Sequence, residues 1–394
     1  MTNFNYYAPT RVVFGKGTVD KVGELVKSQG ARKVLIHYGG GSVKRTGLLD
    51  RVKTSLAAAG VESVELGGAM PNPRLSLVRK GIDLCKAEGV DFLLPVGGGS
   101  TIDSCKAMGY GVACGGDVWD FYDFKRTPTA CLPIGVVLTI AAAGSEMSNS
   151  SVITNEDGWI KRGCNSDLCR PRFAVLDPEL TMTLPDYQTA CGCTDILMHT
   201  MERYFNDDAE PMALTDAIAE GLMRTVMESA RVLVKDPRDY TARANVMWAG
   251  SLSHNGLTAC GSGNGDWATH KLEHELGGMF DVAHGAGLAA LWGTWARYVL
   301  PCNPGRFARF GVKVLGVEPQ EDDTATALKG IEAMEDFYRE LGMPTNLREL
   351  GIAELTEAQV QELARKAFAG APKGLGFVKR LSQEDMAEIY RRAR

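Results

Sequence analysis

The sequence predicts an α/β domain followed by an all-α domain. Helical and strand signals alternate between residues 18 and 176, and glycine-rich turns follow two of the predicted strands. After residue 186 the segments keep helical spacing and convincing strands disappear. A chain of 394 residues has room for both domains. We therefore predict domains at residues 1–185 and 186–394, with a single mixed domain as the alternative.

The first-half elements follow from apolar spacing and from the glycines that end them. Apolar residues recur with helical spacing from Thr18, and Gly30, Gly60 and Gly89 each end a predicted helix. The predicted helices are Thr18–Gln29, Leu48–Ala59, Leu75–Glu88 and Ser100–Met108. The predicted strands are Lys33–Tyr38, Val61–Leu66, Phe92–Val96, Leu132–Leu138 and Phe173–Leu176. This alternation predicts a mostly parallel sheet covered by helices.

The second half begins after a turn at residues 184–186. Each of its segments has the apolar spacing of a helix that packs against others. The predicted helices are Asp195–Phe205, Leu214–Val234, Thr241–Ala259, Trp267–Gly277, Ala325–Leu341 and Thr356–Phe368.

Composition excludes several functional classes. Hydrophobic residues make up 45% of the chain, charged residues 23%, and the net charge of −5 comes without any long basic run, so we expect no nucleic-acid partner. No apolar stretch reaches 18 residues and the first 11 residues do not resemble a signal peptide, so we expect a cytoplasmic protein with no membrane partner. Ten cysteines in this length are too few for a disulfide framework.

Two glycine runs at strand ends predict phosphate binding. Gly97, Gly98, Gly99 and Ser100 follow one strand and open a helix, whose free N–H groups attract an anion. The second run is Gly39, Gly40, Gly41 and Ser42, which follows the strand Lys33–Tyr38. The pair predicts one extended dinucleotide, whereas either run alone is equally compatible with a tight turn. A GxGxxA match at Gly285, Gly287 and Ala290 lies in the helical half, and we interpret it as close helix packing.

Five of the six histidines fall between residues 199 and 284. Asp195 and His199 are four residues apart in a predicted helix, so their side chains leave the same face. His270 and His274 repeat this spacing, and a turn returns the chain to His284. One aspartate with three histidines suits Fe²⁺ or Zn²⁺, while each histidine taken alone is more simply explained as structural.

Two other metal sites compete with this one. Residues 270–274 spell HxxEH, an inverted zinc-protease motif in which Glu273 would be the general base. That hydrolase hypothesis leaves the glycine runs unexplained, so we expect Glu273 on the helix surface. Cys191 and Cys193 lie beside Asp195, yet no CxxC pair supports a thiolate site.

Several separated stretches together identify a resemblance. They are APTRVVFGKG (8–17), YGGGSVKRTG (38–47), GGGSTIDSCK (97–106), AAGSEM (142–147), TDILMHTMERY (194–204) and DWATHKLEHEL (266–276) with DVAHG after it. Over nearly its whole length the chain resembles the iron-containing alcohol dehydrogenase family, in particular its NADPH-dependent butanol dehydrogenase and aldehyde reductase branch. The resemblance implies the dehydroquinate synthase-like fold, with an N-terminal dinucleotide-binding domain and a helical metal-binding domain.

The resemblance also implies roles for individual residues. The implied metal ligands are Asp195, His199, His270 and His284. The residues implied to line the pyrophosphate and the nicotinamide ribose are Gly98, Gly99, Ser100 and Asp103, and those that complete the cofactor cleft are Thr139, Ser145, Lys161, Leu180 and Thr181. His274 matches a position near the substrate and is the candidate proton donor, with a packed histidine as the alternative. His254 has no implied role.

The sequence therefore predicts a metal-dependent, NADP(H)-linked alcohol dehydrogenase for small aldehydes and primary alcohols, working mainly as a reductase and forming a homodimer. A polyol dehydrogenase or a dehydroquinate-synthase-like lyase is the alternative on the same fold. NADP(H) is expected because residues 37–45 contain no acid to hydrogen-bond a ribose 2′-hydroxyl, while Lys44 and Arg45 add positive charge.

Overall fold

The computed structural model describes residues 2–206, 212–263 and 265–394. Tyr7–Leu184 forms one compact unit, and Pro185–Arg394 forms the other together with residues 2–6. The N-terminal residues belong to the second unit because Thr2 N–H donates to Gly261 O (3.0 Å) and Asn255 Nδ2 donates to the Tyr6 hydroxyl (3.3 Å). The predicted fold class, α/β followed by helical, is confirmed, although the sequence did not predict this placement of residues 2–6.

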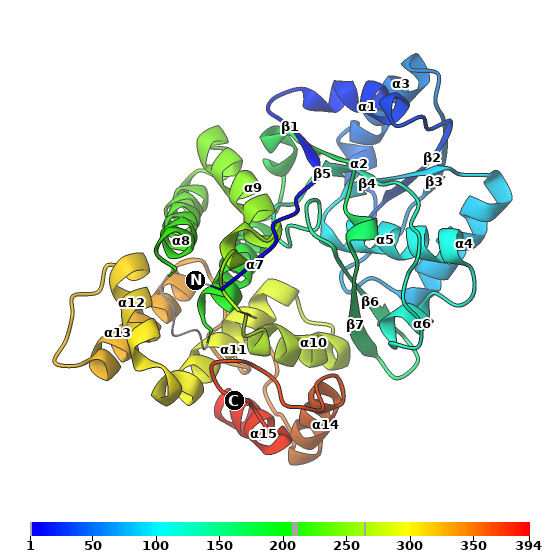
Figure 1. Ribbon diagram of the computed structural model, residues 1–394. Coiled ribbons are helices and arrows are strands. Elements are labelled where there is room, and N and C mark those ends of the chain that lie inside the picture. The colour runs from blue at the N-terminus through cyan, green and yellow to red at the C-terminus, as the bar shows by residue number, and fades with distance from the viewer. Residues whose placement is uncertain (1, 207–211, 264) are drawn as a thin grey trace. The chain divides into compact units, whose positions relative to one another are not determined.

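A six-stranded parallel sheet forms the centre of the first unit (Figure 1). Its strand order is β1-β8-β5-β4-β2-β3. The strands are β1 (Arg11–Phe14), β8 (Phe173–Leu176), β5 (Gly135–Leu138), β4 (Phe92–Gly97), β2 (Lys33–Tyr38) and β3 (Glu62–Leu66). Five of them were predicted, two of those with the observed bounds. β1 was missed because its four residues are too few to show a pattern.

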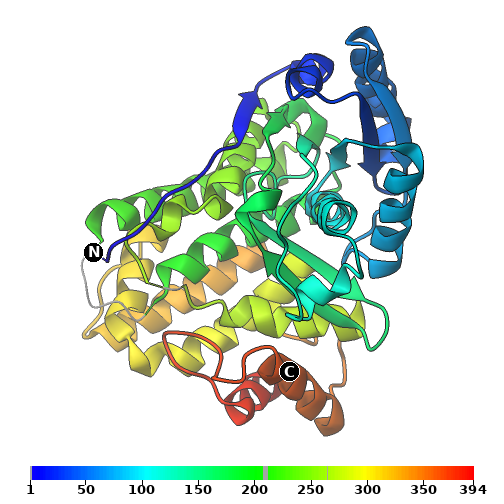
Figure 2. The same cartoon turned by 45° about the vertical axis from the view of Figure 1, so that its right-hand side comes forward.

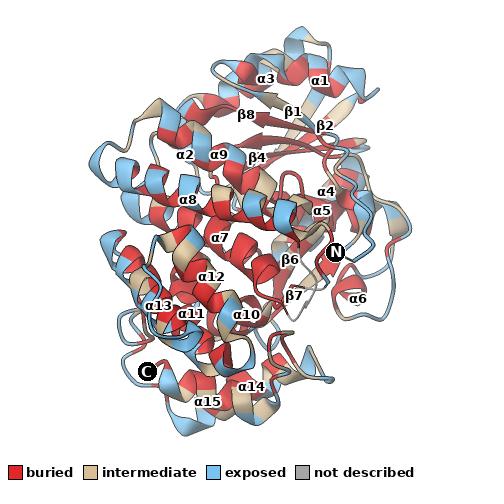
Figure 3. Cartoon of the chain, turned by 60° about the vertical axis from the view of Figure 1, so that its left-hand side comes forward, coloured by how far each residue is buried: buried red, intermediate tan, exposed pale blue. Residues whose placement is uncertain are grey.

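Helices cover both faces of this sheet, and their apolar faces form its core. The helices are η1 (Thr18–Lys21), α1 (Val22–Ser28), α2 (Ser42–Arg45), α3 (Leu48–Ala58), α4 (Leu75–Glu88), α5 (Gly99–Cys114) and α6 (Trp119–Tyr122). Alternate strand residues such as Ile36 and Leu94 pack with α1 and α3. On the opposite face, the close approach of Leu93 to Gly109 places α5 against β4. Figure 3 shows β4 and β8 as buried, whereas the edge strand β1 is partly exposed.

An antiparallel pair, β6 (Ser150–Asn155) and β7 (Ile160–Asn165), lies apart from the main sheet. This pair was not predicted, because residues 148–166 are mostly polar and lack alternation. The 3₁₀ helices η2 (Asp167–Cys169) and η3 (Pro178–Thr181) flank β8. The pair belongs to the same unit as α5, with which β6 is in contact.

The second unit is a bundle of helices (Figures 1 and 2). Its members are α7 (Asp186–Tyr204), α8 (Ala213–Lys235), α9 (Tyr240–His254), η4 (Leu257–Ala259), α10 (Ala268–Phe280), α11 (His284–Val299), η5 (Leu300–Cys302), α12 (Pro304–Leu315), α13 (Asp323–Glu340), α14 (Glu357–Ala369) and α15 (Gln383–Arg392). α7 contacts α8, α9 and α11, and α11 also contacts α10. Within the described ranges, no helix is both long and apolar enough to cross a membrane.

Three of these helices, α11, α12 and α15, were not predicted. α11 is glycine-rich and apolar around most of its circumference, because it is buried on nearly every side. Such a helix shows little amphipathic spacing. The GxGxxA match lies in it, and a Cβ at Gly285 would lie 2.2 Å from Cys191 O. Our interpretation of that match as close helix packing is confirmed.

Candidate metal centre

α7 carries three acidic or imidazole side chains on one face. Asp195, His199 and Glu202 are separated by four and three residues, which places them on consecutive turns of the same side. All three are at most 4% exposed, because this face of α7 is turned into the bundle. The helix therefore presents two carboxyl groups and one imidazole to a water-poor interior.

α10 and α11 bring the other two histidines to this face. His270 lies in the first turn of α10 and is 4% exposed. α10 starts there because Asp266 accepts a hydrogen bond from Ala268 N–H (3.1 Å) and also from the N–H groups of Phe377 (2.7 Å) and Val378 (2.8 Å). His284 is the first residue of α11. Its place depends on the packing of α11 against both α7 and α10.

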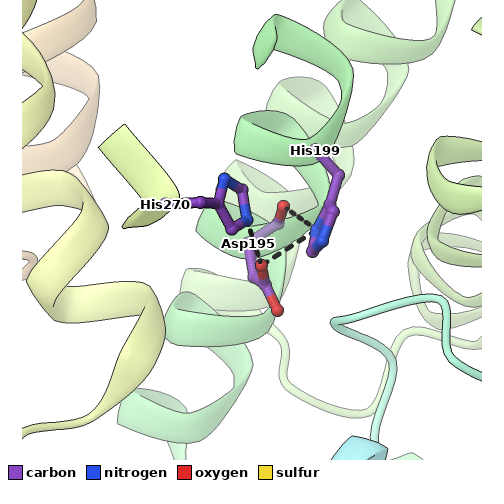
Figure 4. A group of neighbouring side chains, drawn as sticks. All are labelled: Asp195, His199 and His270. Atoms are coloured by element: carbon purple, nitrogen blue, oxygen red, sulfur yellow. Dashed lines mark hydrogen bonds and ion pairs between the residues drawn. The ribbon is translucent and has the colours of Figure 1, made fainter. Parts of the chain in front are cut away.

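Three of the four predicted ligands, the histidines, converge on a carboxylate oxygen of the fourth, Asp195 Oδ1. His199 Nδ1 lies 3.0 Å from it, and both His270 Nε2 and His284 Nε2 lie 3.7 Å from it. Figure 4 shows His199 and His270 facing Asp195 from two sides. Two ligand atoms that share an ion tetrahedrally at about 2.1 Å are about 3.4 Å apart. The observed spacing of 3.7 Å therefore needs little adjustment to hold one ion.

Every one of these imidazoles also presents its Nδ1 to an oxygen atom of the protein. The pairs are His199 with Asp195 O (2.9 Å), His270 with Glu202 Oε1 (3.0 Å) and His284 with Glu273 Oε2. An oxygen that only accepts fixes the proton on Nδ1 and leaves a lone pair on Nε2. For His270 and His284, whose Nε2 faces Asp195 Oδ1, this is the arrangement in which outer carboxylates hold metal-binding histidines.

The electrostatics of the cluster favour a cation. Burial opposes ionisation of Asp195, but the neighbouring imidazoles His199 and His284 outweigh it and hold its pKa well below the usual range. Burial lowers the pKa of His199 to about 4, so this ring is neutral near pH 7. Burial also favours the neutral form of His270, yet Asp195 and Glu202 raise its pKa overall. Acidic groups thus surround imidazoles that a metal ion would bind in place of a proton.

Two buried atoms support this fit directly. In the described part of the chain, Asp195 Oδ1 and His270 Nε2 are buried, lie 3.7 Å apart and make no hydrogen bond of normal geometry, although His199 Nδ1 is close to Asp195 Oδ1. Buried polar atoms are normally paired, so such orphans indicate a missing partner. An ion between them would satisfy both, and an oxygen with imidazole nitrogens is a donor set suited to Fe²⁺ or Zn²⁺.

Our expectation that Glu273 lies on the helix surface is wrong. The side chain is fully buried and its carboxylate contacts His284 Nδ1. It fits there because a Cβ at the facing Gly287 would lie only 2.9 Å from Glu273 Cγ. A carboxylate engaged in this way is not poised as the general base of the HxxEH hypothesis.

Two further histidines and two cysteines lie near the cluster. The His274 ring centre lies 5.9 Å from that of His284, and the side chain is 7% exposed. His254, which has no predicted role, packs its ring 4.2 Å from that of His199. Burial raises the pKa of Cys191 to about 11 and that of Cys193 to about 12, so both remain thiols and do not favour the thiolate alternative.

In the first unit, the predicted cofactor residues follow the carboxyl ends of four strands. β2, β4, β5 and β8 run in parallel, and the segments at or just beyond their carboxyl ends hold Gly39–Ser42, Gly97–Ser100, Thr139 and Leu180–Thr181 respectively. β2 and β4 are neighbours with Tyr38 opposite Val96, so the two glycine runs lie side by side. Nucleotides bind at this edge of open parallel sheets.

Close contacts with the segment after β5 explain the glycines after β4. A Cβ at Gly98 would lie 3.1 Å from Ile140 Cβ, and one at Gly99 would lie 3.1 Å from Ala143 Cβ. Thr139 N–H donates to Gly97 O (3.0 Å), which ties the loop after β5 to this turn. The glycine run thus lets a neighbouring loop approach the N-terminus of α5.

A buried network fastens the segment that holds Ser145. Lys106 Nζ donates to Ser145 O (2.8 Å), Ser148 O (3.0 Å) and Ser150 O (2.7 Å). Asp103 accepts from Ser145 Oγ (2.6 Å) and from Val152 N–H (2.8 Å), and burial raises its pKa. Both oxygens of Asp103 thus bond within the protein. No sequence pattern had indicated a role for Lys106.

The remaining predicted cofactor residues differ in exposure. Lys161 is 7% exposed on β7, opposite Thr154, although an isolated lysine would be expected on the surface. Leu180 packs against the core of the sheet, and the buried Thr181 hydroxyl donates to Pro178 O (2.8 Å). These positions carry no spacing signal, so the family resemblance alone pointed to them.

Comparisons with known proteins agree with this geometry. The sequence pattern described as "Iron-containing alcohol dehydrogenase" matches residues 9–178, and that described as "Fe-containing alcohol dehydrogenase family, C-terminal" matches residues 189–394. The chain belongs to the iron-containing alcohol dehydrogenase family. This makes an oxidoreductase acting as an alcohol dehydrogenase the supported class of activity.

Individual members of the family are similar over their whole length. NADH-dependent butanol dehydrogenase A of Clostridium acetobutylicum is 40% identical, with 100% of both chains covered. NADPH-dependent aldehyde reductase YqhD of Escherichia coli is 34% identical, again with 100% of both covered. The crystal structure of NADH-dependent butanol dehydrogenase A from Thermotoga maritima superposes with a TM-score of 0.96 at 40% identity, covering 100% of this chain and 99% of that one. The fold is therefore that of this alcohol dehydrogenase family.

Proposed function

We propose that this alcohol dehydrogenase is a metal-dependent, NADP(H)-linked enzyme that reduces small aldehydes to primary alcohols. The observation that carries the proposal is the convergence of three imidazoles on Asp195 Oδ1, two of them through Nε2 at 3.7 Å. Asp195, His199, His270 and His284 would hold one Fe²⁺ or Zn²⁺ ion. A bound ion supplies Lewis-acid polarisation of a carbonyl group, and the nicotinamide supplies the hydride.

The chain itself contributes orientation, desolvation and a proton. Burial keeps His199 neutral and leaves its ring available as a ligand, and the oxygen at each Nδ1 fixes how each ring points. His274, one turn after His270 on α10, is the proposed donor of the proton that completes the alcohol. Its ring lies beside that of His284. We also propose a homodimer.

The reaction and the ion are tested together. We expect elemental analysis of protein purified without added metal to find iron or zinc, and NADPH oxidation to occur with two- to six-carbon aldehydes. Glycerol and a diol are also tested as substrates for oxidation, because a polyol dehydrogenase would oxidise them. Absence of nicotinamide-dependent turnover with every compound, in protein that contains its metal, would contradict the proposal.

The choice of NADP(H) rests on the loop after β2. Lys44 and Arg45 are exposed beside Gly39–Ser42, and a Cβ at Gly40 would meet no atom within 4 Å. The expectation that no acid is available needs one correction, because Glu65 on β3 accepts a hydrogen bond from the Tyr38 hydroxyl (3.0 Å). That carboxylate is paired with Lys53 (2.6 Å), which offsets its charge. The relatives' names include both NADH- and NADPH-dependent enzymes.

Gly40→Asp tests this choice without steric strain, since the added side chain points into open space. A carboxylate beside a 2′-phosphate repels it by about 1–4 kcal/mol at close range. We expect the ratio of kcat/KM for NADPH over NADH to fall at least tenfold. A wild-type enzyme that prefers NADH would overturn the NADP(H) part of the proposal and leave the metal part standing.

A further inference from the structure

Glu273 is a buried acid to which neither the family resemblance nor the proposed reaction gives a role. It lies on α10 between His270 and His274, and its Oε2 contacts Nδ1 of His284 on α11. The carboxylate is fully buried, whereas the His284 side chain is 28% exposed. A buried acid is costly unless it is paired, so this contact needs a reason in the function of the site.

The sequence of α11 makes room for the contact. His284 and Gly287 are three residues apart and face α10 together. A Cβ at Gly287 would lie 2.9 Å from Glu273 Cγ and 3.2 Å from Glu273 Oε1. Any larger residue at 287 would displace the carboxylate from His284. The first turn of α11 therefore supplies both the imidazole and the space that its acidic partner occupies.

We propose that Glu273 is a positioning residue that keeps the proton of His284 on Nδ1 and directs Nε2 toward Asp195. The proposal rests on the metal centre proposed above. His284 Nε2 lies 3.7 Å from Asp195 Oδ1, on the side of the ring away from Glu273. Without the carboxylate the ring is free to rotate or to place its proton on Nε2, and either change removes a ligand from the ion.

Glu202 supplies a parallel on the other side of the site. Its Oε1 accepts from His270 Nδ1 (3.0 Å) and from the His270 main-chain N–H (2.9 Å). Two of the three imidazoles thus use a buried glutamate, from different helices, in the same way. The repeated arrangement indicates that the contact of Glu273 belongs to the site and is not an incidental contact of packing.

A competing role for Glu273 is that of a metal ligand. Glu273, His274 and His284 offer ligand atoms that all lie within 4.8 Å of one another. However, Glu273 Oε2 and His284 Nδ1 are in direct hydrogen-bond contact, which leaves no room for an ion between them. The same nitrogen cannot both donate to the carboxylate and bind a metal. The contact is therefore explained by Glu273 positioning the His284 ring. The number of metal ions bound per chain distinguishes this role from that of a ligand.

The test compares Glu273→Ala and Glu273→Gln in full-length protein. Zn²⁺ affinity is measured by chelator competition, and the geometry of the site by the visible absorption of Co²⁺. We expect Glu273→Ala to weaken Zn²⁺ binding by about 10- to 100-fold and to change the Co²⁺ spectrum. Glu273→Gln keeps an acceptor oxygen, so its affinity is expected closer to that of the wild type.

Leu276→Ala is the matched control, because it removes a fully buried side chain from the same helix and leaves the carboxylate in place. It lowers the thermal midpoint, whereas the Zn²⁺ affinity stays within about threefold of wild type. Gly287→Ala is the second variant, since it displaces Glu273 without deleting it. We expect weaker Zn²⁺ binding there also, which covers the case in which Glu273→Ala does not fold.

The outcomes separate this inference from the proposed function. If wild-type protein binds no ion that depends on Asp195, the metal centre itself is wrong. If Asp195→Asn loses the ion while folded Glu273→Ala and Gly287→Ala bind Zn²⁺ as tightly as wild type, only the positioning role is overturned. A wild type that binds two ions per chain, one of which Glu273→Ala loses, would show that Glu273 is a ligand instead.

Discussion

Replacing Lys106 by methionine tests whether a buried ammonium group holds the loop beside α5. The amine is fully buried and donates to three main-chain oxygens, those of Ser145, Ser148 and Ser150, at 2.7–3.0 Å. Methionine fills a similar volume but donates no hydrogen bond, so the three carbonyl groups lose their partner. Asp103, whose pKa Lys106 lowers, loses its nearby positive charge as well.

The expected magnitude follows from these contacts. Each buried carbonyl left without a donor costs about 1–3 kcal/mol. The variant no longer buries an ammonium group, and this gain offsets part of the loss. With three carbonyl groups affected and part of the loss offset, we expect a net cost of about 3–5 kcal/mol. For a unit of this size, we expect the thermal midpoint to fall by roughly 10 °C.

The assay is thermal and urea unfolding of Lys106→Met beside Lys86→Met. Lys86 is an exposed residue of α4 in the same unit, and its replacement is expected to change the free energy of unfolding by no more than about 0.5 kcal/mol. The KM for the nicotinamide cofactor is expected to rise in Lys106→Met, because Lys106 holds Ser145, a proposed cofactor-binding residue, in place. A loss of stability below about 1 kcal/mol would refute the reasoning.

Two further predictions concern packing and pH. Gly285→Ala places a Cβ 2.2 Å from Cys191 O, so we expect a loss of at least about 2 kcal/mol in thermal unfolding, whereas Gly221→Ala, whose nearest neighbour is 4.0 Å away, should be neutral or slightly stabilising. Burial lowers the pKa of His37 to about 4, despite its contact with Leu66 O. Below pH 6.5 the unfolded chain binds a proton there that the folded chain does not, so this residue should remove about 3 kcal/mol of stability between pH 6.5 and 4. Urea titrations at several pH values measure this slope, which His37→Phe should reduce; an unchanged slope would contradict the assignment.

Sequence patterns predicted most of the fold where local signals were strong. Lys33–Tyr38 and Leu75–Glu88 have the observed bounds, because a β-rich apolar run and a glycine-terminated amphipathic segment are both local features. β6 and β7 escaped prediction because their residues are mostly polar, and because β6 packs against α5, which is distant in sequence. α11 escaped because a helix buried on most sides has no polar face to reveal its period.

In the candidate site too, residues with a local sequence signal were predicted and residues placed by helix packing were not. The spacing of Asp195 and His199 predicted that they share a face of a helix. Glu202 lies three residues further along the same helix, so its place on this face could also have been predicted from the sequence. Glu273 was misplaced because its burial depends on the packing of α10 against α11. A local signal did exist, since Glu273 is three residues from His270 and therefore lies on the same face of the helix. Only the fold shows that a glycine on α11 faces it.

The central claim is that Asp195 and three histidines hold one divalent ion on which catalysis depends. The most direct measurement is the number of ions bound per chain, determined by titrating metal-free wild-type protein and Asp195→Asn with Zn²⁺ and with Fe²⁺ while following NADPH oxidation by butanal. We expect one ion per wild-type chain, with activity rising in proportion to occupancy. We also expect a folded Asp195→Asn protein that binds neither ion tightly and is inactive. Full activity of metal-free wild-type protein, or unchanged ion binding in Asp195→Asn, would show that catalysis does not depend on an ion at Asp195.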